Sequence, residues 1–293
     1  MDWSKAKTYL ILTFLLLDLV LGYQYYTSQQ EALGYVQSFD TQLEELKEVL
    51  RERKMMIVTE VPKETPVLNF IQVWHPKEPI QQIAGKILQD ERLVENDQSR
   101  GTMKFRSLEG DFEVTPDGFF RLNFEPGLMK AEKDLGTKRG QYALQRVAPY
   151  VWNGAMYKED VALNNFAKGT TTLRYLQSYQ RYPIFSAVLE INLQNAEIIS
   201  YKQKALEVGA EEEVGQRVIS AIGAIRTVAE TFDPAAVTDP SGIAAIHDVK
   251  LGYYSQNYVG ADVWYLAPMW RIVTDGKVFY VNALTGQLED NGT

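Results

Sequence analysis

Residues 101–127 have the sequence GTMKFRSLEGDFEVTPDGFFRLNFEPG, in which apolar and polar side chains alternate. Alternation over four to eight residues is typical of a β-strand with one buried face. Glu109-Gly110 and Asp117-Gly118 are tight-turn sequences between the alternating runs. The stretch therefore predicts three antiparallel strands, at residues 102–108, 111–115 and 118–124.

The residues before these strands predict two more strands and a helix. Met55–Glu60 and Pro66–Trp74 have strand composition, whereas Pro79–Leu93 has apolar residues at helical spacing. We therefore expect an N-terminal α+β domain at residues 55–130. The charged stretch Met129–Gly140, which contains two glycines, indicates a domain boundary.

A helix is also predicted upstream of this domain. Within Ser28–Lys54, apolar residues recur at steps of three and four, and acidic and basic residues fall on the opposite face. This juxtamembrane helix, at residues 27–54, is expected to pack on the first domain. A coiled coil with a partner is the alternative.

The second half of the chain repeats internally with a period of 79. Residues 175–201 align with residues 254–280 without a gap, so that Tyr175 matches Tyr254 and Tyr201 matches Tyr280. A helical pattern precedes each copy, at residues 138–152 and 211–232. The sequence therefore predicts a C-terminal α+β domain at residues 136–290, with two units at residues 136–204 and 211–288. Each unit would be a helix followed by a three-stranded antiparallel meander, because one apolar sheet face needs a covering layer.

The N-terminal sequence MDWSKAKTYLILTFLLLDLVLGYQYY predicts a membrane anchor. Residues 1–7 would be a cytoplasmic tail and residues 8–26 a transmembrane helix, with the remainder exported according to the positive-inside rule. Ala32-Leu33-Gly34 has the form of a signal-peptide cleavage site but lies well past the apolar run, which favours a retained anchor. The residues expected to orient and anchor this helix are Trp3, Lys5, Lys7, Tyr23, Tyr25 and Tyr26.

One carboxylate, Asp18, interrupts the apolar run. An ionisable group near the middle of a membrane costs about 2.5–3.5 kcal/mol on insertion scales. Asp18 could lie near the outer interface and be partly hydrated. Alternatively, it forms a hydrogen bond with another transmembrane helix, worth about 0.6–2 kcal/mol. Asp18 and Thr13 are the candidate partner-binding residues of the predicted span.

Composition and motifs argue against several functional classes. The net charge of −8 argues against a nucleic-acid partner, and the absence of cysteine excludes disulfides and thiolate metal sites. We find no catalytic motif, and we expect no cofactor, no metal and no enzymatic activity. His247 stands beside Asp248 but has no candidate nucleophile. Aromatic residues in the predicted strands are expected in the core, with a carbohydrate- or peptide-binding face as the alternative: Tyr175, Tyr179, Tyr254, Tyr258, Trp264, Tyr265 and Trp270.

The opening MDWSKAK, followed by a single apolar span, resembles the YycI (WalI) family. Three further segments share the resemblance: YPIFSAVL at residues 182–189, IISYKQ at 198–203 and WRIVTDGKVFYVNALTG at 270–286. The resemblance implies PepSY-like units in a single-pass, extracytoplasmic accessory protein of the cell membrane. It also implies that this protein binds the sensor histidine kinase YycG (WalK) together with YycH (WalH). The family usually carries an uncharged amide near position 18, where this chain has Asp18.

Three functional hypotheses follow. The first is a non-enzymatic regulator of a cell-wall two-component system, which contacts the kinase through its transmembrane helix and its exported domains. The second is an extracytoplasmic sensor that binds a cell-wall fragment or a peptide on its aromatic strands. The third is an enzyme acting on wall polymer, which would require two convergent carboxylates in a cleft.

Overall fold

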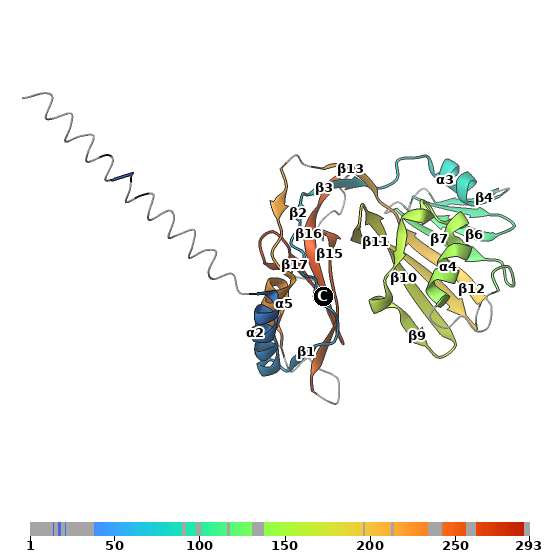
Figure 1. The fold of residues 1–293 in the computed structure, drawn as a ribbon. Helices are drawn as coiled ribbons and strands as arrows, with labels where there is room; N and C mark the ends of the chain where they lie inside the picture. Colours follow the sequence, from blue (N-terminus) through green and yellow to red (C-terminus); the bar gives the residue numbers. More distant parts are fainter. Residues whose placement is uncertain are drawn as a thin grey trace, which may run out of the picture. The chain divides into compact units, whose positions relative to one another are not determined.

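The computed structural model describes residues 14, 17–18, 21, 38–89, 92–97, 101–115, 118–130, 138–195, 197–211, 214–233, 242–255 and 262–289. The chain divides into two units, residues 1–48 and residues 49–293. The fold is mixed α+β and dominated by β-sheet, as predicted (Figure 1).

The first unit contains the whole predicted membrane segment. Phe14, Leu17, Asp18 and Leu21 are helical and exposed. The predicted tail (1–7), the other residues of the predicted span (8–26) and residues 27–37 lie outside the described residues. The same is true of Thr13, Trp3, Lys5, Lys7, Tyr23, Tyr25 and Tyr26. Among the residues that are described, no helix is long and apolar enough to cross a membrane.

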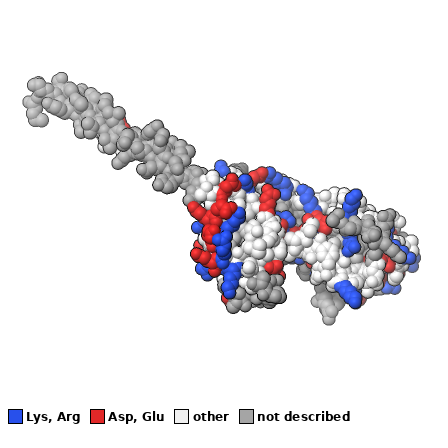
Figure 2. Space-filling view, turned by 60° about the horizontal axis from the view of Figure 1, so that its bottom comes forward, with Lys and Arg blue, Asp and Glu red and all other residues white. Residues whose placement is uncertain are grey.

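Helix α2 (Phe39–Glu52) lies within the helix predicted at residues 27–54, whose juxtamembrane position remains a prediction. Its start is capped by Ser38, whose hydroxyl accepts a hydrogen bond from the backbone nitrogen of Thr41 at 3.2 Å. Leu46 and Leu50 are buried, and the charged residues are exposed, as the helical spacing predicts. Figure 2 shows acidic and basic side chains gathered on this part of the surface.

Seven antiparallel strands form what we name the first half-sheet. Their order is β10 (Thr170–Tyr179), β11 (Tyr182–Gln194), β12 (Glu197–Lys204), β7 (Phe119–Phe124), β6 (Gly110–Val114), β5 (Thr102–Arg106) and β4 (Arg92–Asp97). Two short strands, β8 (Tyr157–Glu159) and β9 (Asn165–Ala167), pair with the outer edge of β10. One face of the half-sheet packs with α3 (Ile80–Ile87) and α4 (Arg139–Val147) into a single apolar core.

Strands β5, β6 and β7 confirm the meander predicted from residues 101–127. Every predicted strand end agrees with the structure to within about two residues. At the turn before β6, Gly110 has φ +140°, and a Cβ there would lie 1.9 Å from the carbonyl oxygen of Asn123. The predicted helix 79–93 was too long, since α3 ends at Ile87 and Arg92 begins strand β4. Pairing with β5 gives residues 92–97 a tertiary partner that the local sequence does not reveal.

The first half-sheet crosses the predicted domain boundary. Strand β7 pairs with β12, so that Leu122 lies opposite Tyr201. Side chains from both sides of residues 131–137 also share one core. The domain limits 55–130 and 136–290 remain a prediction.

The second half-sheet is built on three antiparallel strands, β15 (Ala244–Tyr254), β16 (Trp264–Thr274) and β17 (Val278–Asn282). It is completed by β1 (Met55–Ile57), β3 (Ile71–Trp74), β13 (Glu207–Glu211) and β18 (Leu288–Glu289), of which β1 runs parallel to β15. Strands β11 and β15 join the two half-sheets in parallel at Ile184 and Tyr253. The single strand predicted at 66–74 is two strands, since β2 (Val67–Leu68) pairs separately with β14 (Gln216–Arg217).

Helix α5 (Ala221–Thr231) contributes apolar residues to the core, but the predicted helix 211–232 began too early. Glu211 ends strand β13, and the Ser220 hydroxyl caps α5 by accepting from the Gly223 nitrogen at 3.1 Å. Both halves of residues 138–289 contain a helix and, later in the chain, three antiparallel strands: α4 and β10–β12 in one, and α5 and β15–β17 in the other. In the first half, the short strands β8 and β9 come between the helix and β10. That the two are copies of one PepSY-like unit remains a prediction.

Two buried glutamines hold connecting segments against the sheet. The Gln203 side chain accepts from the Trp152 nitrogen at 3.1 Å and donates to the Trp152 carbonyl at 2.6 Å. Gln177 bonds both backbone groups of Leu206 in the same way, at 3.1 and 2.6 Å. Each side-chain amide thus takes the place of a strand's peptide group.

Candidate functional site

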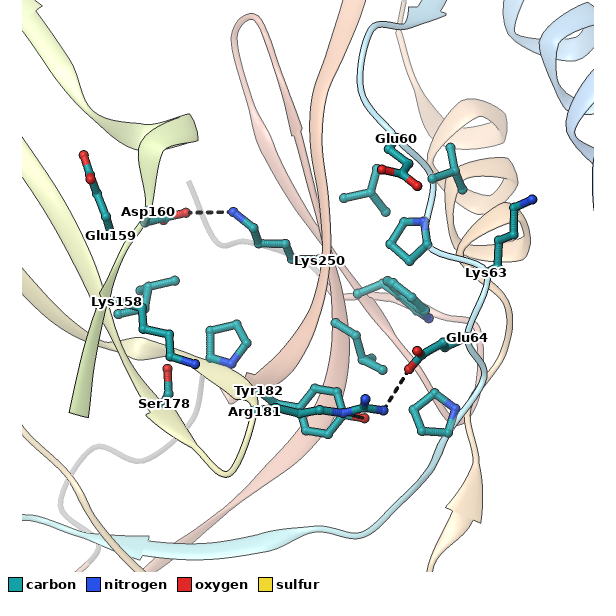
Figure 3. A pocket seen from close by; sticks show the side chains of 18 residues that line it. Glu60, Lys63, Glu64, Lys158, Glu159, Asp160, Ser178, Arg181, Tyr182 and Lys250 are labelled. Atoms are coloured by element: carbon teal, nitrogen blue, oxygen red, sulfur yellow. Dashed lines mark hydrogen bonds and ion pairs between the residues drawn. The ribbon is translucent and has the colours of Figure 1, made fainter. Parts of the chain in front are cut away.

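A pocket of about 620 Å³ lies in the second unit, lined by the loop 60–66, the end of β8, the β10–β11 turn and strand β15 (Figure 3). Its charged lining is balanced. Four residues are basic: Lys63, Lys158, Arg181 and Lys250. Four are acidic: Glu60, Glu64, Glu159 and Asp160. Proline, leucine, valine and tryptophan side chains supply the apolar part.

A buried ion-pair cluster lies beside this pocket. Arg271 donates to both carboxylate oxygens of Asp160 at 2.6 Å and to Asp248 at 2.8 Å. The Lys250 ammonium lies 3.0 Å from Asp248 and 3.7 Å from Asp160. Arg174 approaches Asp160 at 3.8 Å. We name these five residues the Arg271 cluster.

The fold determines this cluster, because its members come from distant parts of the chain. Arg271 and Asp160 are 111 residues apart and are 0% and 1% exposed. Asp248 and Lys250 are two residues apart on β15, so both point to the same face, next to Arg271 on β16. The Phe185 ring covers the guanidinium at 4.8 Å from its centroid. The pairing is therefore well shielded from water.

The cluster fixes the charge of Asp160. Burial by itself raises the pKa of the Asp160 carboxyl, but hydrogen bonds and charge from Arg271, with Lys250 and Arg174, outweigh it and lower the pKa below its usual value. Burial likewise lowers the pKa of Arg271, and the bonds to Asp160 and Asp248 raise it overall. Asp160 is therefore an anion at neutral pH, with its oxygens already accepting hydrogen bonds.

Across the pocket from this cluster, the Arg181 guanidinium donates to Glu64 at 2.8 Å and to the Tyr182 hydroxyl at 3.0 Å (Figure 3). Arg181 and Glu64 are mostly exposed, so this pair is screened by solvent and opens easily. Two of the four lining carboxylates, Asp160 and Glu64, are thus engaged with cations. The arrangement is suited to binding a polar chain or ligand rather than to acid–base chemistry.

The structure separates the residues that the sequence singled out. Of the two residues proposed to contact a partner, Asp18 is described, and it shares an exposed helical face with Phe14, Leu17 and Leu21. His247 pairs with Asp275 rather than with its neighbour Asp248, and it lies at a β-bulge where the register of β15 on β16 shifts between Ile246 and Asp248. Within the described residues, no group of three or more histidine, aspartate or glutamate side chains is placed to hold a metal.

Most of the aromatic residues serve the core. Tyr175, Trp264 and Trp270 are buried, whereas Tyr265 is 51% exposed and Tyr258 lies outside the described residues. Trp270 also lines the pocket, and its indole nitrogen donates to the Ile219 carbonyl at 3.0 Å. The aromatic strands thus form no single exposed face among the described residues.

Sequence reasoning missed the Arg271 cluster. The available signal was one arginine in an otherwise apolar strand, WYLAPMWRIVT at residues 264–274. A cation inside such a run requires a buried anion, because long charged residues are almost never fully buried without a partner. The sequence does not reveal that the partner is Asp160.

Comparison with known proteins gives one family match. The family described as "YycI protein" matches residues 34–284. No curated protein matches the chain. The fold is similar to that of an uncharacterized protein from Eubacterium rectale, with a TM-score of 0.47 and 9% identity over 80% of this chain and 89% of that one. It is also similar to the YpeB C-terminal domain of Bacillus megaterium, with a TM-score of 0.40 and 9% identity over 74% of this chain and 96% of that one.

Proposed function

The chain belongs to the YycI family, whose match covers most of its length, and on this basis we propose that it is a non-enzymatic regulator that binds the sensor kinase YycG (WalK) together with YycH (WalH). The family supports a regulatory role in the YycG/WalK system and association with a membrane. The family match carries the proposal. The proposed contact with the kinase and with YycH goes beyond the family match, and it is supported by the helical face around Asp18 and by the pocket.

The exposed face around Asp18 supports a contact between helices. Phe14, Leu17, Asp18 and Leu21 are spaced at i, i+3, i+4 and i+7, so they share one helical face. A carboxyl group among large apolar side chains would contribute one hydrogen bond to a neighbouring transmembrane helix, and the flanking residues would contribute packing. In this proposal the N-terminal helix spans the membrane once, with Thr13 as a second polar contact.

The pocket supports binding rather than catalysis by the exported part. Its charged lining is balanced in sign, and the Asp160 carboxylate is committed to Arg271. A protein that changes the state of a kinase must bind one state more tightly than the other, and it needs no chemistry to do so.

Capture of the full-length chain from membranes, with the kinase and YycH present, tests this function. We expect both proteins to be recovered with the wild-type chain. Recovery of the kinase should fall with Asp18→Leu and be largely kept with Asp18→Asn, because the amide still forms hydrogen bonds. Equal recovery with Asp18→Leu and wild type would rule out the Asp18 contact, and absence of both proteins from the wild-type sample would rule out the regulator itself.

A ligand sensor is the second candidate, because the pocket volume of about 620 Å³ is typical of small-molecule sites. Trp270 lines the pocket, so bound ligand should change tryptophan fluorescence. Titration with soluble wall fragments measures this change. A signal that persists in a Trp270→Phe variant would come from elsewhere and count against the pocket.

A further inference from the structure

The face of the first half-sheet opposite its core carries a row of charged residues, one per strand. Each faces the next as a cross-strand neighbour. From β10 to β4 the row is Arg174, Glu190, Lys202, Arg121, Glu113, Lys104 and Glu95. We name this row the charge ladder.

Most neighbours in the charge ladder have opposite charges. Arg174 lies 3.5 Å from Glu190, and Arg121 lies 3.9 Å from Glu113. Lys104 approaches Glu95 at 2.7 Å. Opposite charges on facing strands stabilise a sheet, and like charges directly opposite destabilise it.

The exception is at the centre of the ladder, where Lys202 on β12 lies directly opposite Arg121 on β7. Among the described residues no salt bridge joins Lys202 to a carboxylate, although Glu190 lies opposite it on β11, and the Lys202 ammonium lies 4.4 Å from the centroid of the Phe119 ring. Lys204, only 8% exposed, lies 5.2 Å from the same ring. The aromatic face attracts the Lys202 ammonium but leaves its charge in place.

Two adjoining hollows, of about 340 and 200 Å³, surround Phe119 and share Lys202. Their charged lining consists of Arg174, Lys202, Lys204 and Arg121 against two glutamates, Glu190 and Glu113. This local excess of positive charge occurs in a chain whose net charge is −8. We name the two hollows together the Phe119 hollow.

The Phe119 hollow also provides polar and apolar contacts for a ligand. The Ser186 hydroxyl lines it and is buried without a hydrogen-bond partner among the described residues. Tyr254 and Tyr280 line the same hollow with rings stacked 4.1 Å apart. A buried hydroxyl without a partner has a free-energy cost that a bound acceptor would remove.

From this convergence of cations, hydroxyl and aromatic rings we propose that the Phe119 hollow binds a phosphate group carried by a small polyol or sugar. Lys202, Lys204 and Ser186 line the larger hollow together, and a multiply charged oxyanion has acceptors for all three groups. The tyrosine rings would contact the carbon skeleton. The Phe119 hollow shares no lining residue with the pocket described above, but it adjoins the Arg271 cluster, because Arg174 belongs to both. The proposal does not depend on the regulatory function proposed above.

Isothermal titration calorimetry of the full-length chain in a nonionic detergent, with glycerol 3-phosphate as the probe, tests the proposal. We expect saturable binding that weakens with added salt. Lys202→Gln should weaken it about tenfold or more, because a charge-assisted hydrogen bond contributes this much. Lys104→Gln is the matched control, since it removes a cation of the same ladder that already pairs with Glu95.

A second measurement separates binding from a structural role. Lys202 lies between Arg121, which repels it, and Glu190, which attracts it. Because these two effects oppose each other, Lys202→Gln should leave the urea midpoint of the ligand-free chain nearly unchanged. A chain that unfolds more easily with this substitution, with binding unchanged, would assign Lys202 to the sheet and overturn the proposal. Absence of binding at millimolar probe would overturn it as well, as would equal weakening by Lys104→Gln.

A third titration identifies the source of the phosphate. Glycerol 3-phosphate is titrated into the chain bound to phosphatidylglycerol vesicles or to phosphatidylcholine vesicles. A soluble ligand predicts that glycerol 3-phosphate binds regardless of the vesicle. A lipid headgroup predicts that phosphatidylglycerol competes with the probe in the wild-type chain and does not in Lys202→Gln. If neither titration depends on Lys202, the proposed site is wrong.

Discussion

The Arg271 cluster and the charge ladder use the same residue types in opposite ways. In the cluster, Arg271 and Asp160 are almost fully buried and two short hydrogen bonds join them. In the ladder, Lys104 and Glu95 are about half exposed, and Lys202 faces another cation across the strands. A buried charged side chain therefore needs an oppositely charged partner. On an exposed sheet face, two cations can lie opposite each other, and their charge is then available to a ligand.

Removal of one partner from the buried cluster should have the largest effect. Asp160→Asn leaves Arg271 buried with only part of its compensating charge, and we expect the free energy of unfolding to fall by about 3–5 kcal/mol. Urea denaturation followed by tryptophan fluorescence measures this change. Glu113→Gln, which weakens a partly exposed ladder pair, is the control and should cost less than about 1 kcal/mol. Equal losses for the two variants would erase the contrast between the regions.

Lowering the pH should remove the stabilising contribution of Asp160 in the Arg271 cluster. The pKa of Asp160 is lower in the folded chain than its unfolded value of about 3.9, so its contribution to stability is present above that value and disappears as the pH falls through the folded pKa. The stability difference between the wild-type chain and Asp160→Asn should therefore be full at pH 7 and shrink below about pH 4. Urea titrations across this range provide the measurement. A difference that stays constant would mean that charge is not the cause.

The smallest effects are expected within the charge ladder, and they should differ in size. Lys104→Gln loses an exposed ion pair and should lower the free energy of unfolding by about 0.2–1 kcal/mol. Lys202→Gln loses its contact with the Phe119 ring and its attraction to Glu190. It also loses its repulsion from Arg121, so stability should be nearly unchanged. Thermal denaturation at low and high salt tests both, because salt screens exposed charges. A stability loss in Lys202→Gln larger than that in Lys104→Gln would contradict the comparison.

Local sequence patterns predicted the strands and helices whose apolar residues are regularly spaced. The alternation in residues 110–124 predicted β6 and β7, because the buried apolar residues of both strands share one core with α3 and α4: Phe112, Val114, Phe120, Leu122 and Phe124. Phe119 is the exception and lies on the other face. The same reasoning predicted the helical spacing of α2. It failed at residues 92–97, whose exposed edge strand has no apolar alternation.

The features that join distant segments could not be read from local patterns. The contact of β7 with β12 crosses a charged stretch that has the composition of a linker. The pairing of Arg271 with Asp160 depends on how β8 and β16 are brought together, and neither residue has a neighbour in sequence that predicts the other. The charge ladder was equally hidden, since its members are unremarkable until the register of seven strands aligns them.

The two buried glutamines have a consequence for how this chain can change over evolutionary time. Gln177 and Gln203 hold Leu206 and Trp152 through main-chain atoms alone, so these bonds do not specify the side chain at either held position. The side chains at residues 152 and 206 are constrained instead by packing, since Trp152 and Leu206 are both buried in the core. Replacement of either glutamine by leucine would release a connection, even though the hydrophobicity of the interior would increase.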